Sequence, residues 1–157
     1  MNDPIWDEKS LRKIYTLAYR LTGDGQAAAA LAEEVCVRLG RRGVNPDSLN
    51  ALPLRTFQEA SSLYLRRYRH LPAANPAPAD GAPAGQQALN ALPPEERVAV
   101  ILRDMFRLPL KELETILAWP RHEVGAALAR GRRNLCRHLG NGNEVSRIGV
   151  NPNKMNG

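Results

Sequence analysis

The first part of the chain has the apolar periodicity of α-helices. Apolar residues three or four positions apart fall on one face of a helix, so such spacing predicts helices rather than strands. The apolar stripe of a first predicted helix consists of Leu11, Ile14, Tyr15 and Ala18. Gly23 ends this helix, and the short polar side chain of Asp24 can cap the next one.

Two more helices are predicted before residue 70. The stripe of the second helix consists of Leu31, Val35 and Leu39, and Gly40 and Gly43 end it. The third helix starts near Pro53, because proline is tolerated in the first turn, and it ends before Pro72. Its shared face consists of Phe57, Ser61, Tyr64 and Tyr68.

Further along, the pattern predicts a helix-turn-helix. "LPPEERVAVILRDMF" opens a helix with proline in the first turn and glutamates at the positive end of the helix dipole. Its stripe consists of Val98, Ile101, Leu102 and Met105. A short helix with Leu110, Leu113 and Leu117 follows and is broken by "AWPR". The inward positions of the basic last helix are Val124, Leu128, Gly131 and Leu135. A short helix, a tight turn and a longer basic helix are typical of this motif.

A segment rich in proline and alanine separates the two helical regions. Residues 71–87, "LPAANPAPADGAPAGQQ", contain four prolines and a single charge, which predicts an extended linker. The predicted fold class is therefore all-α, with two small helical domains joined by this linker, the second of them a helix-turn-helix. The expected organisation is a helical domain over 1–70, a flexible linker over 71–87, a helix-turn-helix domain over 88–139 and a disordered tail over 140–157.

Composition narrows the class of partner. The formal charge of +6 favours a polyanion such as nucleic acid. The two cysteines and three histidines are scattered, which predicts neither a disulfide scaffold nor a metal site. No signal peptide and no membrane-spanning run is evident, so we expect a cytoplasmic protein without a membrane partner. No paired-carboxylate, nucleophile-base or glycine-rich phosphate pattern is present, so we expect no enzyme and no cofactor.

The last helix carries the candidate DNA contacts. The side chains placed to reach base edges at its start are Arg121, His122 and Glu123. The side chains suited to phosphates are Arg130, Arg132, Arg133 and Arg137. Between the two sets, Gly125, Ala126 and Ala127 offer no hydrogen-bonding ends to a base. The arginines are either phosphate contacts or a solvated basic face, and the sequence leaves both interpretations open.

Three stretches resemble the RNA polymerase sigma factors of the sigma-70 family, in particular the small two-domain extracytoplasmic-function group. Residues 88–139, from "ALNALPPEERVAVILRDMF" to "GRRNLCRHL", follow the pattern of the family's C-terminal domain. "LRKIYTLAYRLTGDGQAAAALAEEVCVRLGRR" resembles the start of the N-terminal domain, and "LRTFQEASSLYLRRYRH" its promoter-melting helix.

The resemblance implies two large partners, core RNA polymerase and promoter DNA. The N-terminal domain would bind the clamp helices of the β′ subunit and the −10 element, and the C-terminal domain the β flap and the −35 element. An anti-sigma factor is a further implied partner. Candidate polymerase-binding residues are Leu31, Glu33, Glu34 and Val37. On the melting helix, Tyr64 would stack on a base with Arg66, Arg67 and Arg69 on phosphates; alternatively, Tyr64 and Tyr68 are core residues.

Several residues depart from the family pattern. Ala29 and Ala30 replace its usual acidic pair, and Ala118 replaces a turn glycine whose backbone needs positive φ. Glu114 replaces a small alanine, so it either finds a basic partner or holds the two helices apart. Two functions follow as hypotheses: a sigma-70-like transcription initiation factor, or a sigma-derived interaction protein that binds a protein partner without reading DNA sequence.

Overall fold

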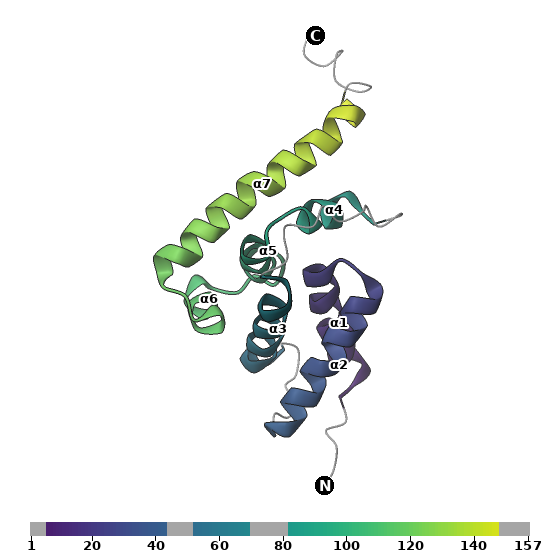
Figure 1. The fold of residues 1–157 in the computed structure, drawn as a ribbon, viewed down its shortest axis with the longest axis vertical. Coiled ribbons are helices and arrows are strands. Elements are labelled where there is room, and N and C mark those ends of the chain that lie inside the picture. The colour runs from purple at the N-terminus through teal and green to yellow at the C-terminus, as the bar shows by residue number, and fades with distance from the viewer. Residues whose placement is uncertain (1–5, 44–51, 70–81, 148–157) are drawn as a thin grey trace.

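The computed structural model describes residues 6–43, 52–69 and 82–147, with side chains described as far as residue 140. Within these ranges the chain is all-helical and has no strand, as the sequence predicts. The first three helices form one group, and the remaining elements pack beside them with the long last helix reaching away from the centre (Figure 1).

The N-terminal group consists of α1 (Glu8–Thr22), α2 (Gly25–Arg41) and α3 (Leu54–Tyr68). Gly23 ends α1 in the left-handed region at φ 71°, and its N–H donates to the carbonyl of Tyr19. Asp24 caps α2 by accepting a hydrogen bond from the N–H of Ala27. The sequence therefore predicts this helix boundary correctly, and the reason is local, because both signals lie within one turn of it.

The C-terminal group consists of α4 (Ala84–Asn90), α5 (Pro94–Val100), the π-helical turn η1 (Ile101–Met105), α6 (Leu110–Leu117) and α7 (Arg121–Arg147). The N–H of Phe106 donates to the carbonyl of Ile101, five residues back, so the predicted continuous helix widens into a π turn.

Two predicted boundaries are wrong. The helix α7 continues to Arg147, so the tail expected to be disordered from residue 140 begins with helix; residues 148–157 lie outside the described part. The expected linker ends early as well, because α4 starts at Ala84 and Gln86 is fully buried. The rest of that linker, up to residue 81, lies outside the described residues.

The core confirms most of the predicted stripes and corrects two of them, one by a single residue, since Met105 of η1 is exposed. Every residue of the α2 stripe is buried, as are Val124 and Leu128 of α7. On α1, however, Leu11 and Tyr15 are exposed, whereas Leu17 and Leu21 are fully buried. The two choices of face differ by a small rotation of the helix, and its packing against α2, α3 and α4 selects one of them.

The two helical groups share one core. In this arrangement α3 packs on α5 and α6, and α1 packs on α4. The rings of Phe57 on α3 and Phe106 after η1 meet edge to face, with centroids 5.4 Å apart. A continuous cluster of buried apolar side chains runs through both groups. The sequence favours two separate modules, whereas the structure packs them against each other.

Candidate nucleic-acid interface

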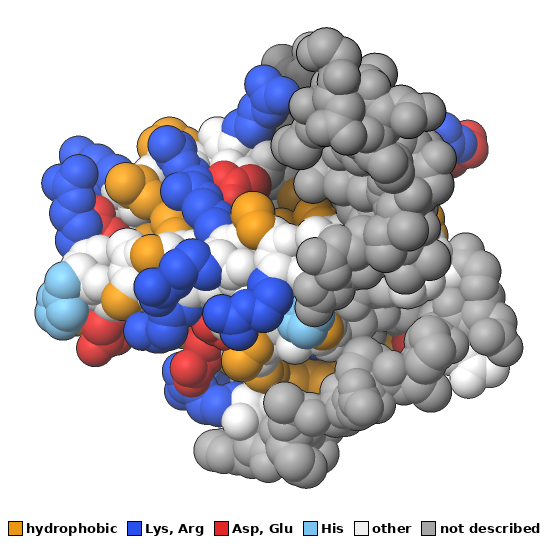
Figure 2. All heavy atoms as spheres, turned by 90° about the horizontal axis from the view of Figure 1, so that it is seen from above, with side chains coloured by type: hydrophobic (Ala, Val, Ile, Leu, Met, Phe, Trp, Pro, Cys, Tyr) orange, Lys and Arg blue, Asp and Glu red, His pale blue; other side chains and the backbone are white. Residues whose placement is uncertain are grey.

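The predicted DNA-binding arginines of α7 lie on the surface. Figure 2 views the molecule from above and shows Lys and Arg side chains in blue on this face. They divide into two sets. Arg132 donates to both carboxylate oxygens of Asp104, which raises the pKa of its guanidinium through this hydrogen bonding. Arg130 lies 3.8 Å from the Glu96 carboxylate. These two arginines therefore hold α7 to α5 and η1.

The second set is free of such pairing. Arg121, Arg133 and Arg137 are exposed, and none of them forms an ion pair with another residue whose side chain is described. An exposed guanidinium without an internal partner can reach a phosphate at little cost in desolvation. The surface best suited to phosphates is therefore smaller than the sequence alone suggests.

The turn of the helix-turn-helix keeps an unusual backbone without a glycine. Ala118 ends α6 in the left-handed region, at φ 55° and ψ 38°. A residue with a Cβ is less stable there than glycine by about 1–2 kcal/mol. The positive φ expected at this position is thus confirmed, although the residue is alanine. Glu114 lies half-buried and forms no ion pair within the described residues.

The start of α7 presents few groups to a base. Arg121, His122 and Glu123 are exposed, and so are Gly125 and Ala126. Ala127 is buried, so it belongs to the core rather than to the surface that would face DNA. Three polar side chains and two small residues therefore make up the exposed part of this helix end, which limits hydrogen-bonded readout to its first turn.

Tyr64, a predicted DNA contact on α3, is inaccessible in this structure. Its ring is fully buried, stacked on Tyr68 with centroids 4.9 Å apart, and the Arg97 guanidinium lies 5.9 Å from the ring centre. Burial raises the pKa of Tyr64 to about 12. In this arrangement Tyr64 is a core residue and cannot stack on a base, which is the alternative that the sequence left open.

The three arginines near the end of α3 have different surroundings. Arg67 pairs with Glu34 of α2, and Arg69 Nε lies 2.9 Å from Glu95 Oε1 of α5. Arg66 borders an open hollow of about 410 Å³ between α3 and α6. Of these three predicted phosphate contacts, two are therefore engaged with carboxylates of the protein itself.

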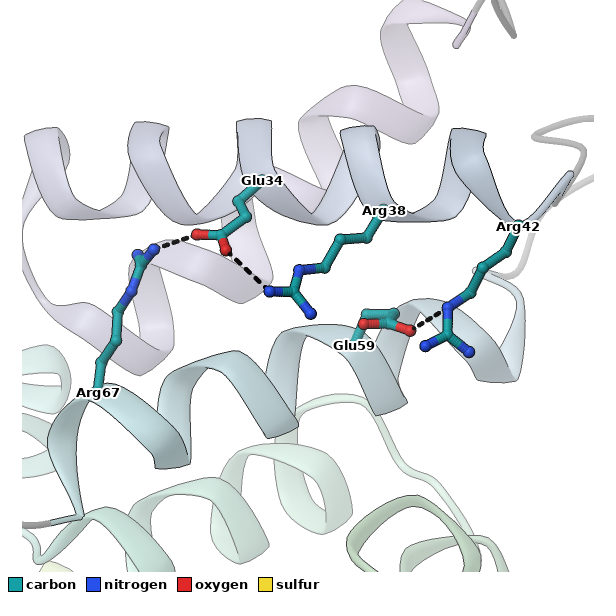
Figure 3. Close-up of polar contacts among 5 residues, drawn as sticks. All are labelled: Glu34, Arg38, Arg42, Glu59 and Arg67. Atoms are coloured by element: carbon teal, nitrogen blue, oxygen red, sulfur yellow. Dashed lines mark hydrogen bonds and ion pairs between the residues drawn. The ribbon is translucent and has the colours of Figure 1, made fainter.

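The candidate polymerase-binding residues of α2 also differ in their exposure and in their contacts. Leu31 is buried in the core, so its prediction as a contact residue is wrong in this arrangement, in which α2 packs against α1 and α3. Glu34 lies 3.3 Å from Arg38 and also pairs with Arg67 of α3 (Figure 3). Glu33 and Val37 are exposed and remain available to a partner.

Polar contacts that the sequence did not predict join the two helical groups. Arg97 of α5 donates to the carbonyls of Leu21 at 2.7 Å and of Leu92 at 3.0 Å. Gln86 of α4 donates to the carbonyl of Arg20 at 3.2 Å and to Asn90 Oδ1 at 2.8 Å. Gln86 and Arg97 make these hydrogen bonds because the last turn of α1 packs against α4 and α5. Residues so far apart in the sequence form no local pattern, so the contact was not predictable.

Two further searches concern other kinds of site. In the described ranges, no three histidine, cysteine or acidic side chains come together in a way that could hold a metal ion. Among the described helices, none is long and apolar enough to cross a membrane.

The all-helical fold with a helix-turn-helix at its C-terminal end defines a class of nucleic-acid-binding architecture. Comparison with known proteins narrows the class. Residues 86–135 match the model of sigma-70, region 4. The chain is 31% identical over 160 residues to the ECF RNA polymerase sigma factor SigE of Mycolicibacterium smegmatis, covering 87% of this chain and 62% of that protein. It therefore spans less than two thirds of that relative's length.

A solved structure has the same fold. The chain matches the sigma factor RpoE of Bartonella quintana, which was crystallised with the anti-sigma factor NepR, with a TM-score of 0.62 at 17% sequence identity. The match covers 83% of this chain and 92% of that one. The predicted resemblance is therefore confirmed: the chain is similar to an extracytoplasmic-function sigma factor, and the segment that matches sigma-70, region 4 includes the helix-turn-helix.

Proposed function

We propose that this protein is a transcription initiation factor of the sigma-70 type, which binds core RNA polymerase and promoter DNA. The single observation that carries the proposal is the agreement of the region 4 match with the observed helix-turn-helix, α6 and α7, over residues 86–135. A protein with this role performs no chemistry of its own and acts by binding two partners at once. The exposed arginines of α7 support contact with the DNA backbone.

The proposed polymerase contact lies on the exposed face of α2. Glu33 and Val37 are four residues apart and both exposed, so they lie on one side of the helix. Val37 is 46% exposed, so its apolar side chain is accessible to a partner. The β′ clamp helices are the proposed occupant because α2 resembles the family helix that meets them.

A titration against purified core RNA polymerase tests this function. The full chain, labelled with a fluorophore, is expected to bind at submicromolar concentration, and Val37→Asp is expected to weaken binding about ten-fold or more, as loss of a central interface residue does. Leu11→Asp is the matched control, because Leu11 of α1 is an apolar residue with a similar exposure of 43%. Absence of binding by the unmodified chain at micromolar concentration would reject the proposal.

A second candidate is a sigma-derived protein that binds another protein and does not read DNA sequence. The observation that favours it is the small, open surface at Gly125 and Ala126, where a Cβ added at Gly125 would meet no atom within 4 Å. Small exposed residues on a helix allow close packing of a partner helix. The salt dependence of DNA binding separates the candidates, because a DNA-binding factor loses affinity steeply as salt rises.

A further inference from the structure

An open hollow of about 410 Å³ lies between α3 and α6, two helices that pack against each other (Figure 1). Hollows that hold small ligands in proteins have volumes of about 300–1,000 Å³, so this one is large enough for a small molecule. The wall on the side of α3 consists of Ser61, Ser62, Leu65, Arg66 and Arg69. The wall at the end of α6 and the turn after it consists of Ile116, Leu117, Ala118 and Trp119.

The wall on the side of α3 is one face of that helix. Ser61 and Leu65 are four residues apart, and so are Ser62 and Arg66, so the two pairs form neighbouring rows along the helix. Arg69, the residue directly after α3, continues the first row by four residues. The face therefore presents hydroxyl groups from one turn and guanidinium groups from the turns that follow.

The charges around the hollow are of one sign. Among the described residues that border it, Arg66 and Arg69 are basic and none is acidic. Arg66 is exposed and forms no ion pair with any side chain that the structure describes. Arg69 pairs through its Nε with Glu95, which does not border this hollow. Because the guanidinium group matches the geometry of phosphate and carboxylate oxygens, the hollow favours an anionic ligand.

A buried hydroxyl in this wall lacks a partner. Ser61 is 1% exposed, and its Oγ forms no hydrogen bond within the described part of the chain. Buried polar groups in native proteins are nearly always paired, so this one indicates a partner that the protein itself does not supply. Rotation about χ1 is the movement that turns the hydroxyl towards a ligand in the hollow. The neighbouring Ser62 is exposed and adds a second hydroxyl to the same wall.

Trp119 gives the hollow an aromatic wall. Its side chain is half-buried and packs against the core, and it directly follows Ala118, whose left-handed backbone ends α6. The neighbouring Ile116 and Leu117 are buried apolar residues. Flat aromatic rings stack favourably on an indole, whatever their pattern of hydrogen-bonding groups. A ligand with a flat aromatic ring is therefore favoured over a purely aliphatic one.

A second hollow, of about 240 Å³, lacks this combination although it shares Arg69 and Trp119. Glu95 and Glu123 border it, so carboxylates accompany its basic side chains. It is also smaller than most hollows that hold a small ligand. The larger hollow is therefore the better candidate for an anion with an aromatic ring.

We propose that the hollow between α3 and α6 is a binding site for a free nucleotide. The phosphate binds Arg66 and Arg69, and the base stacks on Trp119. The hydroxyls of the ribose lie next to Ser61 and Ser62. A nucleotide combines the three kinds of group that the walls favour: an anion, an aromatic ring and hydroxyls. The site goes beyond the proposed function and does not rest on it, because neither polymerase nor promoter DNA contributes to the hollow.

Binding is measured on the full chain by calorimetric titration with AMP and with GMP. Both are expected to bind saturably, with a Kd below about 1 mM. Adenosine, which lacks the phosphate, and ribose 5-phosphate, which lacks the base, are each expected to bind at least about ten-fold more weakly. A Trp6→Phe chain retains Trp119 as its single tryptophan, and its fluorescence is expected to change with the same Kd.

Arg66→Gln is the variant that tests the phosphate contact, and Arg55→Gln is its matched control. Both arginines are exposed and lie on α3, but Arg55 does not border the hollow. Arg66→Gln is expected to weaken AMP binding about ten-fold, as loss of a charge-assisted hydrogen bond does, and Arg55→Gln is expected to leave it unchanged.

Ser61→Ala separates a binding role from a structural one. The hydroxyl has no partner in the described part of the free chain, so its removal is expected to leave the melting temperature unchanged or higher. The same variant is expected to weaken AMP binding about three-fold, because the ligand loses a hydrogen bond. A lower melting temperature with unchanged AMP binding would contradict this role.

The proposal is overturned if neither AMP nor GMP binds, or if Arg66→Gln binds them as tightly as Arg55→Gln does. Inorganic phosphate or adenosine that binds as tightly as AMP would overturn it as well, since the hollow would then not recognise a nucleotide. Single-stranded oligothymidylate that binds in an Arg66-dependent way, without any binding of a free nucleotide, would make the hollow a nucleic-acid contact and reject the proposal. A chain that binds AMP but not core RNA polymerase would support this site and reject the initiation role.

Discussion

Arg132 of α7 forms a bidentate pair with Asp104 of η1, from Nε to Oδ2 at 2.9 Å and from Nη2 to Oδ1 at 2.7 Å. Its neighbour Arg133 is exposed and forms no ion pair with the described side chains. Two adjacent arginines of the same basic helix therefore differ in role. Arg132 fixes the helix to the protein, whereas Arg133 is free to meet a phosphate.

This difference predicts opposite effects of the same substitution. Arg133→Gln is expected to lower the affinity for duplex DNA and to reduce the slope of log affinity against log salt by about 1. Arg132→Gln is expected to leave that slope unchanged and to lower the free energy of unfolding by up to about 1 kcal/mol, because the pair is largely exposed to solvent. Anisotropy at several salt concentrations and urea unfolding measure the two quantities. An equal loss of slope in both variants would contradict this assignment.

A close approach between α5 and α7 predicts the effect of a methyl group. A Cβ added at Gly131 would lie 2.7 Å from Val100 Cγ2 and 3.1 Å from the carbonyl oxygen of Glu96. Gly131→Ala is therefore expected to destabilise the protein by about 1–3 kcal/mol through overpacking. At Gly125, where nothing lies within 4 Å, the same substitution is expected to stabilise it by about 1 kcal/mol through helix propensity. Urea unfolding checks both, and a stabilising Gly131→Ala would show that the helices can move apart freely.

The left-handed backbone at Ala118 predicts a stabilising glycine. Ala118→Gly removes the conflict between Cβ and backbone at φ 55° and adds entropy to the unfolded chain, which partly offsets the gain. We expect a net increase of about 0.5–1 kcal/mol in the free energy of unfolding. Ala126→Gly, on the exposed face of α7, is expected to lower the free energy of unfolding by about 1 kcal/mol, because glycine has the lower helix propensity. Thermal unfolding of the two variants tests the prediction. The prediction is wrong if Ala118→Gly is destabilised as Ala126→Gly is.

Local signals predicted much of this fold. The cap at Asp24, the left-handed end at Gly23 and the stripe around Val35 each depend on residues within one or two turns. The positive φ at Ala118 is what the resemblance implies, because the family has a turn glycine at this position. Such features are encoded by neighbours along the chain, so the sequence is sufficient to find them.

Features that depend on the second helical group were not predictable in the same way. Tyr64 was a candidate for contact with a nucleic acid, and the packing of α5 over α3 places Arg97 above its buried ring. Gln86 belonged to an expected linker, but its hydrogen bonds to the end of α1 place it in the core. The face of α1 was wrong for the same reason, because a rotation that exchanges Leu11 for Leu17 is decided by its neighbours in space.

Buried Tyr64 predicts an alkaline limit to stability. Burial raises its pKa from 10.0 to about 12, an effect that outweighs the opposing charge of Arg97. The neutral form is therefore favoured in the folded state, so this contribution to stability is complete below about pH 10 and is lost as the pH rises towards 12. Tyr64→Phe is expected to reduce this alkaline loss. Because the hydroxyl has no partner within the described residues, the variant is also expected to be as stable at pH 7, or up to about 1 kcal/mol more stable.

Tyr15→Phe provides the control for this prediction, since Tyr15 is 42% exposed and its ring lies on the surface of α1. Urea unfolding at pH 7 and at several values above pH 10 is expected to show a difference in stability between the two variants that grows in the alkaline range. The late step in the tyrosine absorbance titration should disappear with Tyr64→Phe and remain with Tyr15→Phe. If both variants keep that step, Tyr64 is not held under Arg97 in solution, and the closed contact between α3 and α5 is absent.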